Sequence, residues 1–477
     1  MESATSTPDS KSIFEGNNAS PDPENAISKF ASNTAHNYSY PLWRKCLIVF
    51  VTSWMTLAST FSSTSLFTAS SEIAADFSTT ATKVNLSIAG VILAMGFSTF
   101  IWGPIGRIVG RKIAYNACIV ALLAFSIGAA VAPNFRTFVV MRVISGLQGT
   151  YFHVSGQVIL ASCFPPTQRG TATGFFLAGT TLGPPLGPLF AGIIVTFTSW
   201  RIIIWTQAAM IGFGFVMSIL FIPWNKVDEK RDHPPSVREA LAFFSPSPIL
   251  KQMLLPNVLF TDLACGLLSW TQYQLLSAPR KILTNRFHLT SPLIAGLFYL
   301  APAAGFLAGT MIGGRFSDRT VCRWIDRRNG VRLPQDRLNA GMISFFFVVP
   351  AASLVYGWCL EYNKGGLALP IVMAFFTAAG LLSAFASLNT YCAEVLPSER
   401  LQVIAGKYCI QYILGACGSG SADPLIEAIG VGPMSTIGAT LVLIGGILTL
   451  ITARYGLRMQ DWVERRSTGQ SNGEKPR

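Results

Sequence analysis

Glycine and proline recur at regular spacing in Gly170-Thr-Ala-Thr-Gly-Phe-Phe-Leu-Ala-Gly179-Thr-Thr-Leu-Gly183-Pro184-Pro-Leu-Gly187-Pro188, an otherwise apolar run of the sequence. In a helix exposed to water, a glycine costs roughly 1 kcal/mol relative to alanine and a proline about 3 kcal/mol. In a membrane bundle, small residues instead let two helix backbones approach closely, and neighbouring groups satisfy the carbonyls that a proline leaves free. The stretch therefore indicates a membrane-spanning helix that packs tightly against its neighbours.

The composition independently indicates a membrane protein with many spans. Hydrophobic residues make up 51% of the 477 residues and charged residues only 12%, whereas an average soluble domain has about 25% charged residues. Apolar stretches of about 20 residues, which can cross a hydrocarbon core roughly 30 Å thick, occur twelve times. We therefore predict an all-α polytopic membrane protein with twelve transmembrane helices. The predicted spans are 46–68, 84–102, 113–131, 137–163, 171–197, 202–222, 254–278, 292–313, 340–358, 367–391, 404–428 and 433–453.

The basic residues are concentrated on one predicted side of the membrane, which explains the net charge of +13. With the amino terminus in the cytoplasm, 28 of the 36 lysines and arginines fall in cytoplasmic segments, including two near Arg400. Seven fall outside, and the remaining one, Arg142, lies within the fourth span. Membrane proteins generally carry their basic residues in cytoplasmic loops. The asymmetry predicts that both termini are cytoplasmic, and it removes the need for a nucleic-acid partner.

The chain divides into two predicted bundles of six helices. We predict a disordered cytoplasmic tail at 1–40, bundles at 41–224 and 253–455, a polar cytoplasmic linker at 225–252 between them, and a cytoplasmic tail at 456–477. Related turns recur in the two halves, because the fifth and eleventh helices are both preceded by the pattern P-x-x-R. The two copies are Pro166-Thr-Gln-Arg169 and Pro397-Ser-Glu-Arg400.

Two motifs resemble those of the major facilitator superfamily. The spacing G-x8-G-x3-G-P-x2-G of the opening stretch is similar to the fifth-helix signature of its drug:proton antiporters, departing only where Pro188 replaces the last glycine. The family's loop motif G-x-L-x-D-R-x-G-R-R is resembled by Gly103-Pro-Ile-Gly-Arg107-Ile-Val-Gly110-Arg111-Lys112 and by Gly314-Arg-Phe-Ser-Asp318-Arg319. The resemblance covers nearly the whole chain after residue 40, and it implies two six-helix halves that hold a substrate between them. It extends to fungal multidrug and metabolite exporters, including those that carry citrate or itaconate.

The resemblance implies gating roles for two groups of residues. In the family, the aspartate of the loop motif meets the amino-terminal dipole of a helix in the other half and favours one conformation. Arg107 occupies this position in the first copy, whereas Asp318 keeps the acid in the second. An arginine is repelled by the same dipole, so we expect the usual latch to be missing there, unless Arg107 simply joins the basic cytoplasmic face. A hinge and seal is expected on the fifth helix at Gly179, Gly183, Pro184 and Gly187.

Polar stripes on three predicted helices suggest a water-filled cavity. An ionisable residue inside a bilayer costs at least about 3 kcal/mol on insertion scales, so it needs a cavity or a partner. The stripes are Arg142, Gly146, Gly149, His153, Gly156 and Gln157 on the fourth helix, Asp262, Gly266, Ser269, Gln272 and Tyr273 on the seventh, and Ser383, Ser387, Thr390 and Glu394 on the tenth.

The chemistry of these side chains favours an organic anion as substrate. Arg142 and His153, with Gln157, Gln272 and Tyr273 as neutral donors, suit a carboxylate better than a cation. Asp262, His153 and Arg142 are the candidates for coupling transport to protons, because a histidine titrates near pH 6.5. The alternatives are that Arg142 is a structural arginine bonded to backbone carbonyls and that His153 is a hydrogen-bonding packing residue.

We therefore predict a monomeric plasma-membrane exporter that moves a small organic acid by alternating access with proton coupling. Potential-driven uniport stays open, since one unit charge gains about 2.3 kcal/mol per 100 mV. The sequence has no nucleotide-binding loop, zinc-like cluster or nucleophile elbow, so we expect no enzyme activity, cofactor or metal. The alternatives are a multidrug:proton antiporter for apolar or cationic compounds and a transporter-like sensor that carries no flux.

Overall fold

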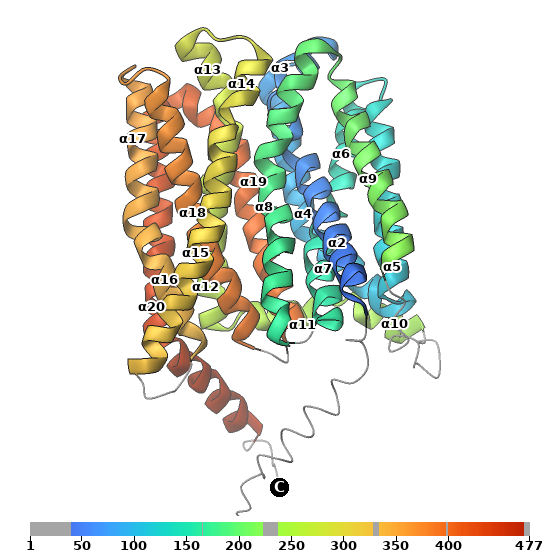
Figure 1. Cartoon of the computed structure of the whole chain (residues 1–477), viewed down its shortest axis with the longest axis vertical. Helices are drawn as coiled ribbons and strands as arrows, with labels where there is room; N and C mark the ends of the chain where they lie inside the picture. The colour runs from blue at the N-terminus through green and yellow to red at the C-terminus, as the bar shows by residue number, and fades with distance from the viewer. Residues whose placement is uncertain (1–39, 165, 223–236, 328–332, 397–398, 472–477) are drawn as a thin grey trace, which may run out of the picture.

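The computed structural model describes residues 40–164, 166–222, 237–327, 333–396 and 399–471. All the secondary structure in those ranges is helical, and most helices run along one common direction (Figure 1). The prediction of an all-α chain is therefore confirmed. The predicted tail at 1–40 lies outside the described residues except for Tyr40, and so does the linker up to residue 236.

The first half of the chain begins at Leu42 and ends at Phe221. Its helices are α2 (Leu42–Thr64), η1 (Ser65–Phe67), α3 (Ser70–Asp76), α4 (Ala81–Val109), α5 (Arg111–Ala130), α6 (Phe135–Gly146), α7 (Gly149–Cys163), α8 (Pro166–Phe197) and α9 (Arg201–Phe221). The described part of the linker forms the short helices α10 (Val237–Phe243) and α11 (Ser247–Met253).

The second half runs from Pro256 to Ser471. Its helices are α12 (Pro256–Ser277), α13 (Pro279–Phe287), α14 (Pro292–Phe298), α15 (Leu300–Arg327), η3 (Pro334–Arg337), α16 (Leu338–Ile343), the π-helix η4 (Ser344–Val348), α17 (Val349–Glu361), α18 (Ala368–Glu394), α19 (Arg400–Ile429) and α20 (Val431–Ser471).

The described residues hold the twelve predicted transmembrane helices. Nine helices are long and apolar enough to cross a membrane, and a tenth comes from Leu241–Met253 and Pro256–Ser277, which meet at a bend of 97°. The other two are the divided helix formed by α6 and α7, and α19, which carries Lys407 and Asp423 among several glycines and serines. A test of single unbroken apolar helices therefore leaves out the broken span and the polar span, although the sequence predicted both.

The fourth helix is broken, which corrects the continuous span predicted at 137–163. Residues 147–148 form a tight turn between α6 and α7. The Tyr151 amide, which is too near the start of α7 to find a helical acceptor, donates to Ser98 Oγ on α4 at 3.0 Å. A Cβ atom on Gly146 would lie 2.5 Å from a backbone oxygen of α4. Close approach of α4 thus satisfies the broken backbone inside the membrane.

Several helices extend beyond their predicted ends. α4 continues from the predicted end at 102 to Val109, α15 from 313 to Arg327, and α20 from 453 to Ser471. An apolar-length rule finds only the part of a helix in lipid, whereas the helix continues in water where charges are tolerated. Both loop motifs therefore begin on helix ends, and Gly110, with φ +89°, stops α4 in a conformation that favours glycine.

The chain enters α2 and leaves α20 at the same end of the bundle, which we call the terminal face; the opposite end is the far end (Figure 1). The α10 and α11 helices lie at the terminal face, whereas α3, α13 and α14 lie at the far end. Between the halves, α4 packs along α19, and α8 packs along α14 and α15. The surface shared by the halves therefore includes α4, α7 and α8 of the first half and α14, α15 and α19 of the second.

Candidate substrate and coupling site

A cluster of aromatic rings joins the two halves near the middle of the bundle. His153 on α7 is fully buried, and its ring centroid lies 5.3 Å from that of Tyr408 and 6.2 Å from that of Tyr412, both on α19. Tyr273 on α12 lies 6.4 Å from Tyr412 by the same measure. His153 Nδ1 lies 3.3 Å from the Gly149 carbonyl oxygen, whereas Nε2 has no hydrogen-bond partner among the described residues. The structure thus brings His153 and Tyr273 into one cluster.

A buried lysine lies beside this aromatic cluster. Lys407 on α19 is only 3% exposed, and its Nζ lies 3.5 Å from the ring centroid of Tyr408. The same nitrogen donates to Asn389 Oδ1 of α18 at 2.7 Å. The ammonium group is therefore held by a neutral oxygen and an aromatic face, in the arrangement of a cation–π contact.

Asp262 lies on α12 next to the same stretch of α19. It is fully buried, and Oδ1 accepts from the Cys392 thiol of α18 at 3.9 Å, whereas Oδ2 has no partner among the described residues. A Cβ atom on Gly406, the neighbour of Lys407, would lie 3.7 Å from Asp262 Oδ2. An acid and a base thus face each other across α12 and α19 without a direct ion pair.

Arg142 lies apart from this cluster, within the first half. Its Nη2 donates to the Ser62 carbonyl of α2 at 2.6 Å, and its Nη1 donates to Ser62 Oγ at 3.1 Å and to Gln207 Oε1 of α9 at 3.5 Å. The guanidinium is 1% exposed. These bonds fasten α6 to α2 and α9, as expected of the structural alternative for a buried arginine. Its role in substrate binding or proton relay stays a prediction.

The predicted glutamine donors lie on the same two helices as His153 and Tyr273. Gln157 is half-buried on α7, one turn beyond His153, and Gln272 is 8% exposed on α12. Their contribution to substrate binding stays a prediction.

The glycines of the opening stretch form a packing seam between α8 and α2. A Cβ atom on Gly179 would lie 2.6 Å from the Ser53 carbonyl oxygen, and one on Gly183 would lie 2.9 Å from that of Leu57. One on Gly187 would lie 3.0 Å from a third backbone oxygen of α2. The two helices run parallel and belong to the same half. The glycines thus hold α8 against α2, and a hinge role for them stays a prediction.

Two threonines of the first half satisfy carbonyls on the proline-rich part of α8. Pro188 has no N–H to give to the Pro184 carbonyl one turn earlier, and this oxygen accepts from Thr64 Oγ1 at 2.9 Å. The Pro188 carbonyl accepts from Thr68 Oγ1 at 2.8 Å. The prolines therefore leave α8 unbroken over its whole length.

The second copy of the loop motif is part of a charged network at the terminal face. Asp318 at the end of α15 accepts from Arg337 Nη1 at 3.1 Å, and Arg337 Nε donates to Glu394 of α18 at 2.9 Å. These three residues link α15, η3 and α18 within the second half. In the first half, Arg107 stands at the position that Asp318 holds in the second copy. The gating roles of Arg107 and Asp318 stay predictions.

The far end is closed by contacts between the halves. Asn85 Nδ2 of α4 donates to Asp423 Oδ2 of α19 at 2.7 Å, and Arg280 of α13 donates to Glu72 of α3 at 2.8 Å. Gly192 of α8 meets the start of α14, where a Cβ atom on it would lie 2.7 Å from a backbone carbon. These contacts join the two halves at the far end.

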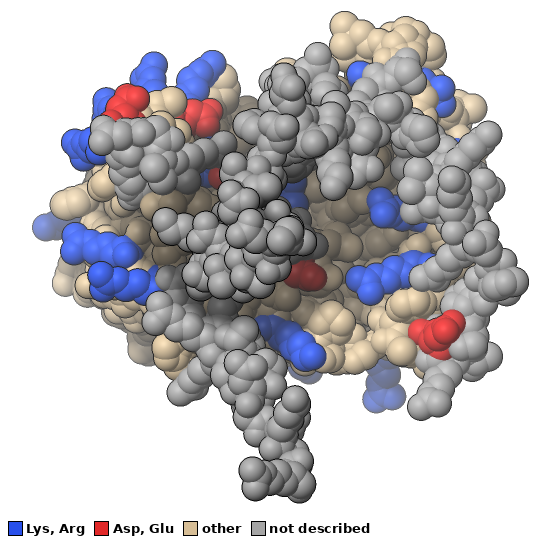
Figure 2. Space-filling model, turned by 90° about the horizontal axis from the view of Figure 1, so that it is seen from below, with Lys and Arg blue, Asp and Glu red and all other residues tan. Residues whose placement is uncertain are grey.

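The terminal face is basic and hollowed. Figure 2, which looks onto this end, shows lysines and arginines around the rim and a recessed surface of uncharged residues inside it. Among the residues that the structure describes at this end, basic side chains are contributed by Arg44, Lys45, Arg107, Arg111, Lys112, Lys251, Arg315, Arg319, Arg323, Arg327, Arg337, Arg400, Arg454 and Arg458.

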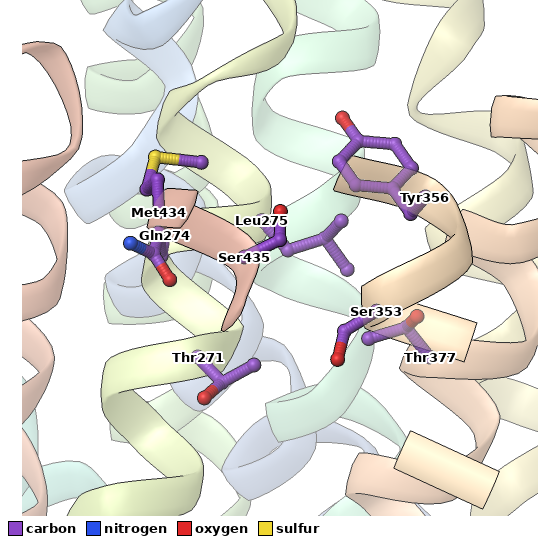
Figure 3. A pocket seen from close by; sticks show the side chains of 8 residues that line it. All are labelled: Thr271, Gln274, Leu275, Ser353, Tyr356, Thr377, Met434 and Ser435. Atoms are coloured by element: carbon purple, nitrogen blue, oxygen red, sulfur yellow. The ribbon is translucent and has the colours of Figure 1, made fainter. Parts of the chain in front are cut away.

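A small cavity lies inside the second half, between α12, α17, α18 and α20. Its volume is about 20 Å³, which is enough for about one water molecule. Polar side chains from all these helices point toward it, among them Gln274, Ser353 and Thr377 (Figure 3), and Gln274 Nε2 has no partner among the described residues. The cavity is too small for an organic substrate.

Lys407 is the main site residue that the sequence reasoning missed. It was counted with the basic residues near Arg400 and so assigned to the cytoplasmic side, but the structure buries it within α19. The signal was present, because Lys407 lies inside the predicted span 404–428 and an ionisable residue within a span needs a partner. Within the described residues, no group of three or more His, Cys, Asp or Glu side chains is arranged to hold a metal ion.

Comparison with curated proteins finds fungal transporters. The chain is 22% identical to the MFS antiporter QDR3 of Candida albicans, over 87% of this chain and 78% of that protein. It is 24% identical to the efflux pump FUBT of Fusarium oxysporum, over 91% and 76% of the two chains. It is 25% identical to the MFS-type transporter hepF of Aspergillus oryzae, over 76% and 78%.

Comparison with solved structures supports the fold. The xylose transporter XylE from E. coli, in a partially occluded inward open conformation, superposes with a TM-score of 0.65 over 86% of this chain and 97% of that one, at 12% identity. The family model of the Major Facilitator Superfamily matches residues 52–419, which is most of the chain. Together with the twelve helices in two halves, this match shows that the chain is a transporter and not an enzyme, and that it belongs to the Major Facilitator Superfamily.

Proposed function

We propose that this protein exports a small organic anion across the plasma membrane by alternating access, with both termini in the cytoplasm. The basic rim of the terminal face (Figure 2) supports this orientation, because basic residues collect on the cytoplasmic side. In this orientation the closed far end faces outward and the recess faces the cytoplasm. The conformation then corresponds to an inward-facing carrier ready to accept substrate from the cell.

The observation that carries the proposal is the ring cluster between the halves with Lys407 beside it. His153 comes from the first half and Tyr408 and Tyr412 from the second, so a compound bound among them contacts both moving bodies. The Lys407 ammonium provides the cation for a carboxylate or sulfonate, and the rings provide an apolar surface. This chemistry suits an anion with a planar or apolar body.

The number of cations in the cluster limits the charge of the substrate. Lys407 is the cation beside the rings, whereas Arg142 is already bonded to Ser62 and Gln207. Each further carboxylate placed in the cluster without a partner costs several kcal/mol of desolvation. A monoanion therefore fits better than citrate, and itaconate is intermediate.

The second candidate is export of apolar or cationic drugs. The aromatic cluster and the unpartnered oxygen of Asp262 favour it, and the names of the relatives include an antiporter and an efflux pump. The buried ammonium of Lys407 argues against a cationic substrate, because like charges repel strongly where water is excluded.

The test is uptake by liposomes that contain the purified protein. Benzenesulfonate and N-methylpyridinium are matched probes, since both are planar six-membered rings with one permanent charge of opposite sign; itaconate and citrate extend the series. We expect saturable transport of benzenesulfonate and itaconate but not of the cation. Lys407→Gln should raise the KM for the anions at least tenfold, whereas Lys364→Gln, which changes an exposed lysine, should not.

The outcomes separate the candidates. Transport of N-methylpyridinium alone would replace the anion proposal with drug export. If none of the compounds enters the liposomes although the protein is folded, the proposal of an anion exporter is wrong. A sensor that carries no flux then becomes the favoured interpretation.

A further inference from the structure

We infer that the anion crosses together with a proton carried by Asp262, so that transport is electroneutral cotransport and not exchange of anion against proton. The inference rests on the proposed function and names its coupling ion. It starts from one juxtaposition, which is a buried acid of α12 beside a buried lysine of α19.

The two charges interact without touching. Asp262 and Lys407 influence each other electrostatically, yet Lys407 donates to Asn389, and Asp262 Oδ2 has no partner. A direct ion pair would use up both groups. The observed arrangement leaves the ammonium able to bind an anion and the carboxyl oxygen able to bind a proton.

The charge balance of the site links the two ligands. With Asp262 ionised and Lys407 protonated, the empty site is neutral, and an added anion would leave one buried negative charge without compensation. With a proton on Asp262, the same anion pairs with Lys407 and the loaded site is again neutral. The site is therefore neutral when empty and neutral when loaded with one anion and one proton.

The proton is accounted for at a single atom. Asp262 Oδ2 forms an O–H bond with a proton taken from water at the terminal face, and that bond breaks when the proton is released to water at the far end. The anion associates with and leaves Lys407 by electrostatic contact, and no other bond forms or breaks.

The surroundings of Asp262 support it as the proton carrier. The titratable groups that face it are Lys407, Tyr408 and Cys409 on α19, Tyr391 and Cys392 on α18, and Cys265 on its own helix. On α11, which packs Met253 against Gly406, Lys251 is exposed at the terminal face. Of these groups, Asp262 is the carboxyl, and its Oδ2 has no partner among the described residues, so this oxygen is placed to take up a proton.

His153 is the competing carrier, and the charges disfavour it. A proton on His153 would place a second cation in the cluster that already holds Lys407, because the His153 ring packs on Tyr408 and the Lys407 ammonium lies over the ring of the same tyrosine. Two cations around one anion would leave the loaded site charged again. His153 then stays neutral and donates its Nδ1–H to the Gly149 carbonyl oxygen.

The experiment measures proton and anion movement together. Wild type, Asp262→Asn and Asp326→Asn are placed in liposomes with a pH dye inside, and labelled benzenesulfonate or itaconate is added outside. Benzenesulfonate stays ionised throughout, so it carries no proton through the lipid by itself. Asp326 is an exposed acid of α15 outside the site, which makes its variant the matched control.

For wild type we expect one proton to move with each benzenesulfonate in the same direction, and no effect of an imposed potential. On the alkaline side of the Asp262 titration, the affinity for the anion should fall up to tenfold per pH unit, as linkage with one proton requires. Asp262→Asn imitates the protonated acid, so it should keep exchange of anion for anion while losing net flux and proton movement. Asp326→Asn should behave as wild type.

Two results would refute the cotransport inference alone, and a third would refute the proposed function as well. Anion flux in wild type without proton movement, or with protons moving the opposite way, rules out cotransport and leaves the anion exporter intact. Net proton-coupled flux in Asp262→Asn rules out Asp262 as the carrier. No flux of either anion in wild type refutes the proposed function and the inference with it. The wild-type measurement tests cotransport even where the variant fails to fold.

Discussion

Replacing Gly183 by alanine tests whether the glycines of α8 form a packing seam within the first half. The matched control is Gly174→Ala on the same helix, because Gly174 is exposed and a Cβ atom there meets nothing within 4 Å. At Gly183 the added Cβ would lie 2.8 Å from Thr60 Cβ and 2.9 Å from the Leu57 carbonyl oxygen of α2. The two variants therefore make the same chemical change in opposite environments.

The magnitudes follow from these distances. At Gly174, alanine should stabilise the helix by about 0.5–1 kcal/mol, because glycine loses more backbone freedom on folding. At Gly183 the same gain is opposed by contacts well inside van der Waals distance, one of them to backbone that cannot rotate away. The helices must separate by a fraction of an ångström, and such overpacking typically costs about 1–3 kcal/mol. The net expectation is destabilisation by about 1–2 kcal/mol.

The assay is thermal unfolding of the purified variants in detergent, followed by size-exclusion chromatography. Gly183→Ala should have a lower Tm than wild type and Gly174→Ala an equal or higher one. Combining Gly183→Ala with Thr60→Ala should recover part of the loss, because it removes the Thr60 hydroxyl that the added Cβ atom would also meet, while Thr60 Cβ and the Leu57 carbonyl stay in place. If Gly183→Ala is as stable as Gly174→Ala, the seam is not tightly packed. If it is stable but transports nothing, the glycine acts in the conformational cycle.

Three further predictions follow from other contacts. Arg142→Ala should lower the Tm and the amount of folded protein at the membrane, because each buried acceptor left without its hydrogen bond costs about 1–3 kcal/mol. Lost efflux at an unchanged Tm would instead support direct substrate binding by Arg142. The Arg201 hydrogen bond lowers the pKa of Asp76, so their pair should stabilise the protein above about pH 4 and lose this effect as the pH falls through the lowered pKa. The Tm difference between wild type and Asp76→Asn should therefore shrink only in strong acid. The free energy that the pair contributes to stability should stay within about 1 kcal/mol because the pair is partly exposed. Gly192→Ala should push the halves apart at the far end. An impermeant maleimide should therefore label Asn85→Cys faster when it is combined with Gly192→Ala than in the single variant.

The sequence was sufficient for the spans because the cost of an unpaired backbone in lipid forces long apolar helices. It was insufficient where a neighbouring helix supplies the missing bonds. The break at 147–148 depends on Ser98 of α4, which lies far away in sequence, so the apolar run through it reads as one helix. The extension of α4 to Val109 was missed because nothing apolar marks a helix in water.

The site residues divide in the same way. Spacing alone placed His153 and Tyr273 on inward faces, and the structure brings them together through Tyr412. The same reasoning placed Arg142 on the same stripe as His153, but the turn at 147–148 separates their helices, and Ser62 binds the guanidinium within the first half. Lys407 was assigned to a loop because a count of charged residues by segment does not show which of them are buried within a helix.

The α8 helix makes two glycine contacts of different kinds. Toward α2 it is also held by directional bonds from Thr64 and Thr68, which would be left unpaired in lipid if the helices parted. Toward α14, the contact at Gly192 carries no hydrogen bond among the described residues, since backbone meets backbone through packing alone. Separating α8 from α14 at the far end therefore leaves no hydrogen-bond donor unpaired in the bilayer. The free energy of this separation depends only on the packed area that the two helices lose. The α8 helix can thus stay hydrogen-bonded within its own half while it separates from α14 without exposing an unpaired polar group.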